Sequence, residues 1–282
     1  MATDLPTTIV IPCYNEEKRL PADELLAFSN QTADIDFLMV NDGSTDRTAK
    51  LIDDLGRKRP DKIRTLHLTA NQGKGEAVRQ GLLKALEGES GIVGYWDADL
   101  SAPLSEILRL RQVLGKHKAL DGVIGARIKL IGRSIDRTTW RHYTGRIIAT
   151  LISTALRLPV YDTQCGAKLF RASPKLKALL EEPFRTRWLF DVEIFARSLL
   201  SFARYGNMSL TFYEEPLEAW THVGASKIGF GDLPVIIKEL WRIWRGYTIK
   251  LRRVGKNAAS QMAVRQSERR ETQLKYDSES VN

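Results

Sequence analysis

The sequence predicts an α/β fold in which helices cover both faces of a mostly parallel sheet. Short runs rich in β-branched and aromatic residues alternate with helical patterns along the first half of the chain, and polar or glycine residues bound each run. The composition agrees with this prediction. The 282 residues are 43% hydrophobic and 27% charged, which excludes a disordered chain, a collagen-like repeat and a small disulfide-built scaffold.

The expected strands are short apolar runs at Thr8–Pro12, Asp36–Val40, Lys62–Leu68, Gly91–Trp96 and Asp121–Gly125. Helical patterns lie between them at Asp46–Leu55 after a Ser44/Thr45 cap, at Glu76–Leu86 after Gly75, and at Pro103–Leu114 after a Ser101 cap. Strands that alternate with helices at this spacing run parallel, so the sheet is expected to be mostly parallel.

The second half of the chain mixes helical patterns with one further strand-like segment. The expected elements are a long helix from about Arg137 to Leu156, the strand-like Tyr161–Phe170, and helices near Pro174–Leu180 and Asp191–Phe202. We therefore expect a folded domain over residues 1–232, an amphipathic basic helix over 233–254 and a disordered polar tail over 255–282.

The charge balance suggests an anionic partner. Lys and Arg outnumber Asp and Glu by 43 to 34, a formal net charge of +9. Nucleic acid is disfavoured because the sequence has no zinc-ligand spacing, RNP-type aromatic motif or helix-turn-helix signature. A phosphorylated small molecule and an anionic membrane surface fit the charge better. With two cysteines, no signal-peptide pattern and no stretch long enough to span a bilayer, the expected location is cytoplasmic, soluble or peripheral on a membrane.

Polar residues gather where four of the expected strands end. The clusters are Pro12–Glu17, Asn41–Ser44, Asn71–Gly75 and Asp97–Asp99. Any one of them could be a tight turn, because Asn, Asp and Gly favour such connections. Ligands bind outside the carboxyl ends of the strands in open parallel sheets, so four clusters at that edge predict a binding site.

Two of these clusters indicate a metal and a diphosphate. Asp97 and Asp99 can offer oxygen atoms to Mg²⁺ or Mn²⁺, which share such ligands with substrate phosphates. The Gln72–Gly75 turn allows a close backbone approach to a diphosphate and adds the cation of Lys74. Neither the P-loop spacing nor a G-x-G-x-x-G follows a strand, which argues against an ATPase and a dinucleotide enzyme.

Four segments, VIPCYNEEKRL, VNDGSTDRTAKLI, NQGKGEAVRQGL and YWDADLSAP, match successive motifs of one enzyme family in order. On these motifs the chain resembles the family-2 glycosyltransferases of the GT-A fold, whose sheet is Rossmann-like. Three later segments, DTQCGAKLF, RWLFDVE and GASK, look most like the dolichyl-phosphate β-glucosyltransferase or polyprenyl-phosphate glycosyltransferase branch. The resemblance extends from about Thr7 to Trp244 and implies that residues 1–232 are a catalytic domain. Asn41, Ala167 and His222 depart from the residues usual in the family.

The resemblance implies roles for individual residues. Its nucleotide-sugar site is made of Pro12, Tyr14, Asn15, Glu16, Asp42, Gly73, Lys74, Asp97, Gln164 and Lys227. Its Mg²⁺ or Mn²⁺ site is made of Asp99, Asp97 and Gln164. Lys168 and Lys227 would meet phosphate charge, and the residues expected to carry catalysis are Asp97, Asp99, Arg127, Arg141 and Lys168.

The chemical nature of the acceptor group that attacks the sugar determines which further residues catalysis requires. The resemblance implies inversion by one direct displacement. A hydroxyl acceptor would need a general base, for which Asp191 and Glu193 are the candidates. A phosphate monoester is largely dianionic at pH 7 and needs cations instead, and the basic run from Arg127 to Arg157 supplies them, unless it is only a solvated helix face. The acceptor-side candidates are Arg127, Arg137, Arg141, Trp188 and Asp191.

The predicted function is an inverting transfer of a hexose, glucose from UDP-glucose, to a polyprenyl or dolichyl phosphate. The alternatives are a hydroxyl acceptor on a soluble glycan or small molecule, and a GDP-mannose-dependent polyprenyl-phosphate mannosyltransferase. Leu233–Val254 has apolar residues at helical spacing with Lys and Arg between them. This pattern fits either an interfacial helix on an anionic membrane, at its cytoplasmic face, or a helix packed on the domain.

Overall fold

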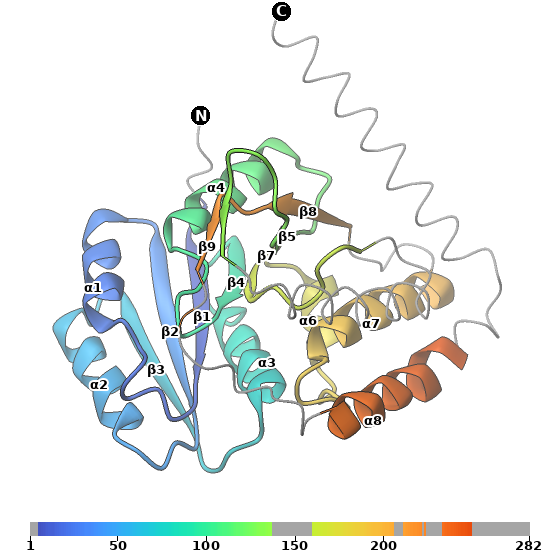
Figure 1. Ribbon diagram of the computed structural model, residues 1–282, viewed down its shortest axis with the longest axis horizontal. Coiled ribbons are helices and arrows are strands. Elements are labelled where there is room, and N and C mark those ends of the chain that lie inside the picture. Colours follow the sequence, from blue (N-terminus) through green and yellow to red (C-terminus); the bar gives the residue numbers. More distant parts are fainter. Residues whose placement is uncertain (1–4, 137–159, 206–210, 222, 224–232, 250–282) are drawn as a thin grey trace, which may run out of the picture.

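The computed structural model describes residues 5–136, 160–205, 211–221, 223 and 233–249. Its centre is a seven-stranded sheet in the order β3-β2-β1-β4-β7-β5-β8 (Figure 1). β7 pairs antiparallel with β4 and β5, whereas the other neighbouring strands pair parallel. The strands are β1 Thr7–Cys13, β2 Ile35–Asp42, β3 Ile63–Leu68, β4 Ile92–Trp96, β5 Gly122–Ala126, β7 Ala167–Arg171 and β8 Phe212–Pro216. The short strands β6 (Ser134–Ile135) and β9 (Ala219–Trp220) form a separate two-stranded sheet.

Helices cover both faces of the large sheet. One face packs against α1 (Ala22–Gln31), α2 (Thr48–Lys58) and α4 (Ser105–Lys116), and the other against α3 (Lys74–Ala85), α6 (Pro174–Leu180) and α7 (Phe190–Tyr205). Right-handed crossovers explain this division. The chain moves outward from β1 to β3, with α1 and α2 on one side, and then returns to β4, which puts α3 on the opposite side.

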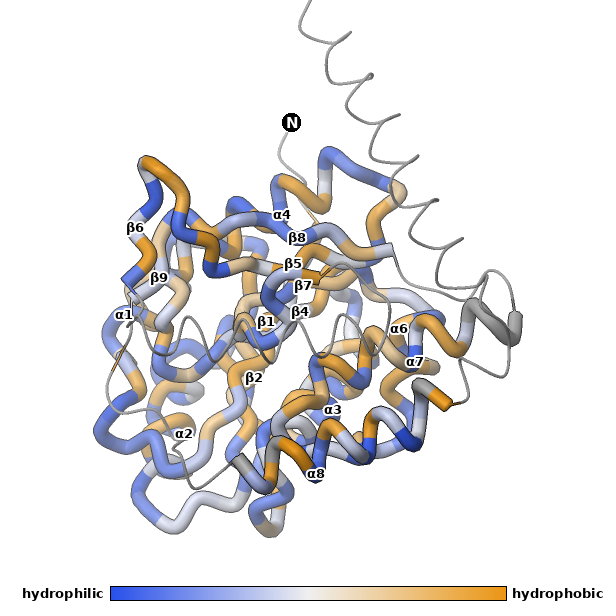
Figure 2. Tube along the Cα trace, turned by 45° about the vertical axis from the view of Figure 1, so that its right-hand side comes forward, coloured by the Kyte–Doolittle hydropathy of each residue, from blue (hydrophilic) through white to orange (hydrophobic). Residues whose placement is uncertain are grey.

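A third layer lies against α7. It consists of α8 (Leu233–Ile243) and the π-helical turn Trp244–Thr248, whose buried Ile243 and Tyr247 pack against apolar residues of α7. Hydrophobic positions concentrate in the strands and alternate with hydrophilic ones along α8 (Figure 2). Among the described residues, no helix has both the length and the apolar character that a bilayer crossing requires.

The predicted α/β fold is confirmed, and the five strands predicted in the first half of the chain occur close to their expected positions, whereas the strand-like Tyr161–Phe170 is a strand only from Ala167 onward. The predicted helix caps are wrong: neither Ser44, Thr45 nor Ser101 caps a helix. Asp46 instead accepts the backbone N–H of Thr48 at the start of α2 (2.9 Å). The sequence reading missed α1, which has no side-chain cap at its start and whose buried positions, Leu25 and Ser29, include a polar residue. The predicted helix 137–156 and the tail 255–282 lie outside the described residues.

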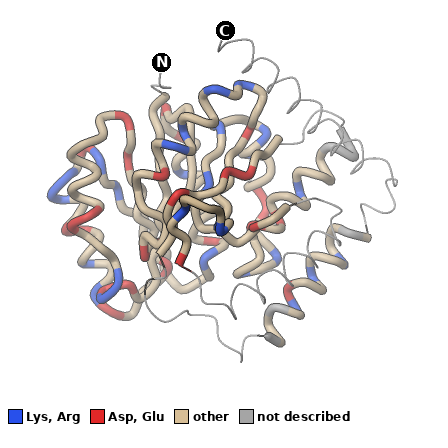
Figure 3. Tube along the Cα trace, turned by 45° about the horizontal axis from the view of Figure 1, so that its top comes forward, with Lys and Arg blue, Asp and Glu red and all other residues tan. Residues whose placement is uncertain are grey.

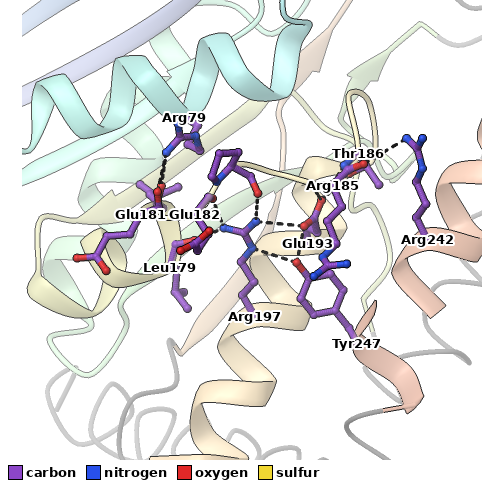
Figure 4. A network of polar contacts seen from close by, with 12 residues as sticks. Arg79, Leu179, Glu181, Glu182, Arg185, Thr186, Glu193, Arg197, Arg242 and Tyr247 are labelled. Atoms are coloured by element: carbon purple, nitrogen blue, oxygen red, sulfur yellow. Dashed lines mark hydrogen bonds and ion pairs between the residues drawn. The ribbon is translucent and has the colours of Figure 1, made fainter. Parts of the chain in front are cut away.

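Glu193, on α7, joins three parts of this layer through one buried carboxylate (Figure 4). Its Oε2 accepts the backbone N–H groups of Arg185 (2.7 Å) and Thr186 (3.0 Å), and also the Thr186 hydroxyl (2.9 Å). Its Oε1 accepts from Arg197 Nη2 (3.2 Å) and the Tyr247 hydroxyl (2.5 Å). Burial raises the pKa of Tyr247 to about 12, with the charge of Glu193 as the next cause, so Tyr247 stays a donor at neutral pH.

We predict that Glu193→Gln lowers the melting temperature by about 5 °C or more, measured by differential scanning calorimetry. The amide turns a hydrogen-bond donor toward groups that are themselves donors, and breaking a buried charge pair costs about 3–5 kcal/mol. Glu182→Gln is the matched control, because Glu182 is exposed on the preceding loop. An unchanged melting temperature for Glu193→Gln would show that this carboxylate does not hold the layer together.

Candidate active site

The four predicted polar clusters meet at one edge of the sheet, where β1, β2, β3 and β4 end. The strand order reverses between β1 and β4, and ligand crevices of open α/β sheets form at such a point. Three contacts join neighbouring clusters: Asn15 N with Ser44 Oγ (3.1 Å), Asp42 Oδ1 with Gln72 N (2.7 Å), and Lys74 Nζ with Asp97 Oδ1 (2.5 Å). The predicted nucleotide-sugar residues Pro12 and Glu16 are buried beside them, and Tyr14 is half-buried.

Asp42 shapes the loop between β3 and α3. Its carboxylate accepts the backbone N–H groups of Gln72 (2.7 Å) and Gly73 (2.8 Å) and the side-chain amide of Asn71 (3.1 Å). Burial raises the pKa of Asp42, and the two backbone donors oppose that effect. The loop is therefore held in one shape just before Lys74.

Lys74 and Asp97 form the centre of the site. Burial works against both charges, but each charge stabilises the other, so the pKa of Lys74 is raised and that of Asp97 is lowered. The backbone just before β7 passes directly over this carboxylate. A Cβ atom on Gly166 would lie 2.0 Å from Asp97 Cγ, so only glycine fits there. Asp97 N–H also donates to Gly166 O (3.0 Å), which fixes the carboxylate against the loop before β7.

Asp99 lies in the turn after β4. Its Oδ1 accepts the backbone N–H of Ser101 (3.1 Å), and its Oδ2 accepts from Arg19 Nη2 (3.3 Å). Leu100 adopts a φ of +48°, a conformation unusual for a leucine, so the turn is tightly constrained. Asp99 remains partly exposed and can reach a ligand.

The residues present fit a hard divalent cation. Asp97 and Asp99 offer carboxylate oxygens and Gln164 an amide oxygen, the kind of ligand atom that Mg²⁺ and Mn²⁺ prefer. In the part of the chain that the structure describes, no group of three His, Cys, Asp or Glu side chains forms a ready-made metal site. Mg²⁺ and Mn²⁺ do not need one, because substrate phosphates and water complete their coordination.

Lys168, expected to contact phosphate, lies beneath the site, where protein groups surround its ammonium. Its side chain is buried, and its ammonium contacts Thr163 O (3.1 Å), Cys165 O (2.5 Å), the Tyr95 hydroxyl (2.9 Å) and Asp191 Oδ1 (2.9 Å). Because an ammonium has only three protons, these protein partners leave none for a phosphate.

Arg127 follows β5 and is paired inside the protein. Its Nε lies 2.7 Å from Asp162 Oδ2, its Nη2 lies 2.8 Å from Asp162 Oδ1, and its guanidinium lies over the Trp220 ring. Burial disfavours this charge, but Asp162 outweighs burial and raises the pKa of Arg127. Arg127 therefore adds hydrogen-bond donors to the site and little net charge. The candidates Arg137, Arg141 and Lys227 lie outside the described residues.

Comparisons with known proteins identify the family. The model of glycosyl transferase family 2 matches residues 8–175, more than half of the chain. The chain belongs to glycosyltransferase family 2. A dolichyl-phosphate beta-glucosyltransferase of Trichomonas vaginalis is 33% identical to it over 253 residues, which cover 86% of this chain and 71% of the relative. A protein of the same name from Drosophila melanogaster is 32% identical, over 87% of this chain and 76% of the relative.

The fold agrees with this family. The crystal structure of glucosyl-3-phosphoglycerate synthase from Mycobacterium tuberculosis in complex with UDP aligns with a TM-score of 0.60 at 19% identity. The alignment covers 86% of this chain and 80% of the synthase. A second structure of that synthase, with Mn²⁺, UDP and phosphoglyceric acid, also aligns with a TM-score of 0.60. At these identities the likeness supports the GT-A fold alone.

The two carboxylates considered as general bases of this glycosyltransferase are both occupied. Asp191, also an acceptor-side candidate, is buried and accepts from the Tyr95 hydroxyl and Lys168. Glu193 holds the five donors described above. The base role proposed for them as an alternative is therefore not supported. Trp188 is half-buried, and its backbone N–H donates to Glu239 (3.2 Å).

Several residues of this glycosyltransferase were missed by the sequence reading. Arg19 pairs with Asp99, Asp162 pairs with Arg127, and Tyr95 lies between Lys168 and Asp191. Arg19 and Asp162 lie within the quoted motifs VIPCYNEEKRL and DTQCGAKLF, so position in a motif was the available signal. Nothing in the sequence indicated which charges would be paired.

Proposed function

We propose that this glycosyltransferase moves glucose from UDP-glucose to the phosphate of dolichol or another polyprenol. The observation that carries the choice of a phosphate acceptor is that Asp191 and Glu193 are both committed to buried partners. A phosphate dianion attacks without a general base, whereas a hydroxyl needs one. The names of the relatives from Trichomonas vaginalis and Drosophila melanogaster support the same donor sugar and acceptor.

The charges of the site support departure of a nucleoside diphosphate. Transfer develops negative charge on the leaving diphosphate and positive charge at the anomeric carbon. Lys74 offers a cation at the start of α3, and Asp97 and Asp99 would hold the divalent ion together with Gln164. When bound, Mg²⁺ or Mn²⁺ supplies Lewis-acid stabilisation of the leaving group. Mn²⁺ in crystals of the mycobacterial synthase supports this choice of metal.

The acceptor phosphate is proposed to bind on the side of Arg127, Arg137 and Arg141. Arg127 is already ionised and oriented by Asp162, so it can present fixed donors without the cost of ordering a free side chain. Asp162 cancels most of its charge, so Arg127 contributes oriented hydrogen-bond donors more than net attraction for a dianion.

A membrane contact through α8 and the following turn is the proposed route to a lipid acceptor. Ile237, Trp241 and Trp244 are exposed, while Glu239, Ile243 and Tyr247 are buried against the domain. Lys238, Arg242 and Arg245 lie among the exposed apolar residues, and basic positions recur along α8 (Figure 3). Tryptophans with interspersed cations suit the headgroup region of an anionic leaflet. The free cysteines Cys13 and Cys165 support the cytoplasmic face.

Transfer assays with radiolabelled sugars test the proposed reaction. We predict that UDP-glucose with dolichyl phosphate yields glucosylated lipid and UDP. GDP-mannose with the same acceptor, and UDP-glucose with unphosphorylated dolichol, should yield little product, since the first changes the base and sugar and the second removes the dianion. Preferred use of GDP-mannose would overturn the donor, and efficient transfer to dolichol would overturn the acceptor.

We also predict that Asp99→Ala lowers turnover by about 10²-fold or more and that chelation of Mg²⁺ and Mn²⁺ abolishes wild-type activity. Removing an electrostatic stabiliser of a leaving group has a cost of this size. The fold should survive, because Asp99 is partly exposed and contacts only Ser101 and Arg19 among the hydrogen bonds described. Asp61→Ala, at an exposed position far from the site, serves as the control. Full turnover in excess chelator would remove the metal from the proposal.

Vesicle sedimentation tests the membrane surface. We predict that wild type pellets with vesicles containing anionic lipid, that pelleting decreases as salt screens the charges, and that Trp241→Ala/Trp244→Ala loses most of it. Leu108→Ala is the matched control, because Leu108 is a similarly exposed apolar residue on α4. Equal pelleting of wild type and the double variant would assign this face to another role.

A further inference from the structure

Arg187 places an exposed guanidinium at the nucleotide end of the site. It begins the RWLFDVE segment, far along the chain from the polar clusters, and the sequence reading gave it no role. Its Nη2 donates to Asn71 Oδ1 (2.5 Å), in the loop between β3 and α3. The charge of Arg187 also acts on Asp42, where it opposes the rise in pKa that burial causes.

The backbone of Arg187 is fixed from two sides. Its N–H donates to Oε1 of the buried Glu239 on α8 (2.7 Å), whose Oε2 accepts the N–H of Leu189 (3.0 Å). Its carbonyl oxygen accepts the N–H of Gly75 in the first turn of α3 (3.0 Å). The side chain therefore leaves a main chain that is held on both sides, which reduces the entropy lost when it binds a ligand.

Gly73 leaves the space that this guanidinium occupies. Its φ is +97°, and a Cβ atom at this position would lie 2.6 Å from Arg187 Nε and 3.2 Å from Arg187 Cβ. Any larger residue would displace the arginine from the loop. The glycine predicted as a nucleotide-sugar residue thus also admits a cation beside Lys74.

Arg187 differs from the other cations of the site in its charge balance. Lys74 pairs with Asp97, Arg19 with Asp99 and Arg127 with Asp162. Within the described residues, Arg187 makes no ion pair, and its one side-chain hydrogen bond goes to a neutral amide. It is an oriented cation at a binding loop, where the nearby carboxylate of Asp42 is turned to the backbone N–H groups of Gln72 and Gly73 and forms no described ion pair with it.

We propose that Arg187 binds a phosphate group of the nucleotide-sugar donor. The proposal rests on the proposed function, because it assumes a donor of that class. A guanidinium matches the geometry of phosphate oxygens and binds them through charge-assisted hydrogen bonds. Lys74 is largely offset by Asp97, so the second cation supplies attraction that the diphosphate would otherwise lack at this end of the site.

Calorimetric titration of Arg187→Gln with UDP, in the presence of Mg²⁺, tests this contact. We expect the dissociation constant for UDP to rise about tenfold or more, the change given by loss of one charge-assisted contact to phosphate. Binding of uridine, followed by ligand-observed NMR, should not change, because uridine has no phosphate. Arg187→Lys should retain part of the affinity, since it keeps the charge and loses the planar donor pair.

Arg185→Gln is the matched control. Arg185 lies two residues before Arg187, is also exposed, and holds its guanidinium over the Tyr247 ring instead of the loop (Figure 4). This variant changes the net charge by the same amount and should bind UDP like wild type. Equal losses in the two variants would reduce the effect of Arg187 to general electrostatics and overturn the proposal.

The remaining outcomes are also decisive. Unchanged UDP affinity in Arg187→Gln overturns the contact, and an equal loss for UDP and uridine assigns Arg187 to the base, which overturns the phosphate contact. Tighter binding of GDP than UDP by wild type would overturn the proposed donor alone. The same comparison with GDP and guanosine would then decide the role of Arg187 independently.

Discussion

The ion pair between Lys168 and Asp191 joins the elements on which the site is built. Lys168 lies on β7, Asp191 on α7 and Tyr95 on β4. The Lys168 ammonium also donates hydrogen bonds to the backbone carbonyl groups of Thr163 and Cys165. Burying two charges costs several kcal/mol each unless hydrogen bonds satisfy them. Here they are satisfied, and burial of Tyr95, followed by the charge of Asp191, keeps the pKa of Tyr95 well above its usual value, so its hydroxyl stays protonated. The loop that carries Gln164 and brings Gly166 against Asp97 rests on this network.

The sequence predicted which segments would meet. The clusters after β1 to β4 are clear polar runs, and the carboxyl ends of parallel strands lie at one edge of a sheet. The sequence could not predict which charged side chains would form ion pairs with one another. Lys168 in DTQCGAKLF reads like a phosphate ligand, yet β7 enters the sheet antiparallel and turns this side chain into the interior. Arg127 reads like a free cation, but Asp162 meets it from a distant segment. Burial and partner choice depend on tertiary contacts that periodicity does not encode.

The end of the site around Asp97 and Asp99 differs from the end around the loop between β3 and α3 in how its charges are paired. Around Asp97 and Asp99, each described cation faces a carboxylate, so a metal or a phosphate that binds there competes with an existing ion-pair partner. Around the loop between β3 and α3, the carboxylate of Asp42 is turned toward backbone N–H groups.

The place of β7 also imposes an order of assembly. β5 (Gly122–Ala126) has no pairing with β4 and takes its neighbours from β7 and β8, both of which follow it in the chain. On the ribosome, the first four strands can pair as soon as they emerge, whereas β5 must wait outside the sheet until Ala167–Arg171 and Phe212–Pro216 have been made. The part of the sheet made of β1 to β4 can therefore form first, and the edge of β4 stays unpaired until β7 is synthesised.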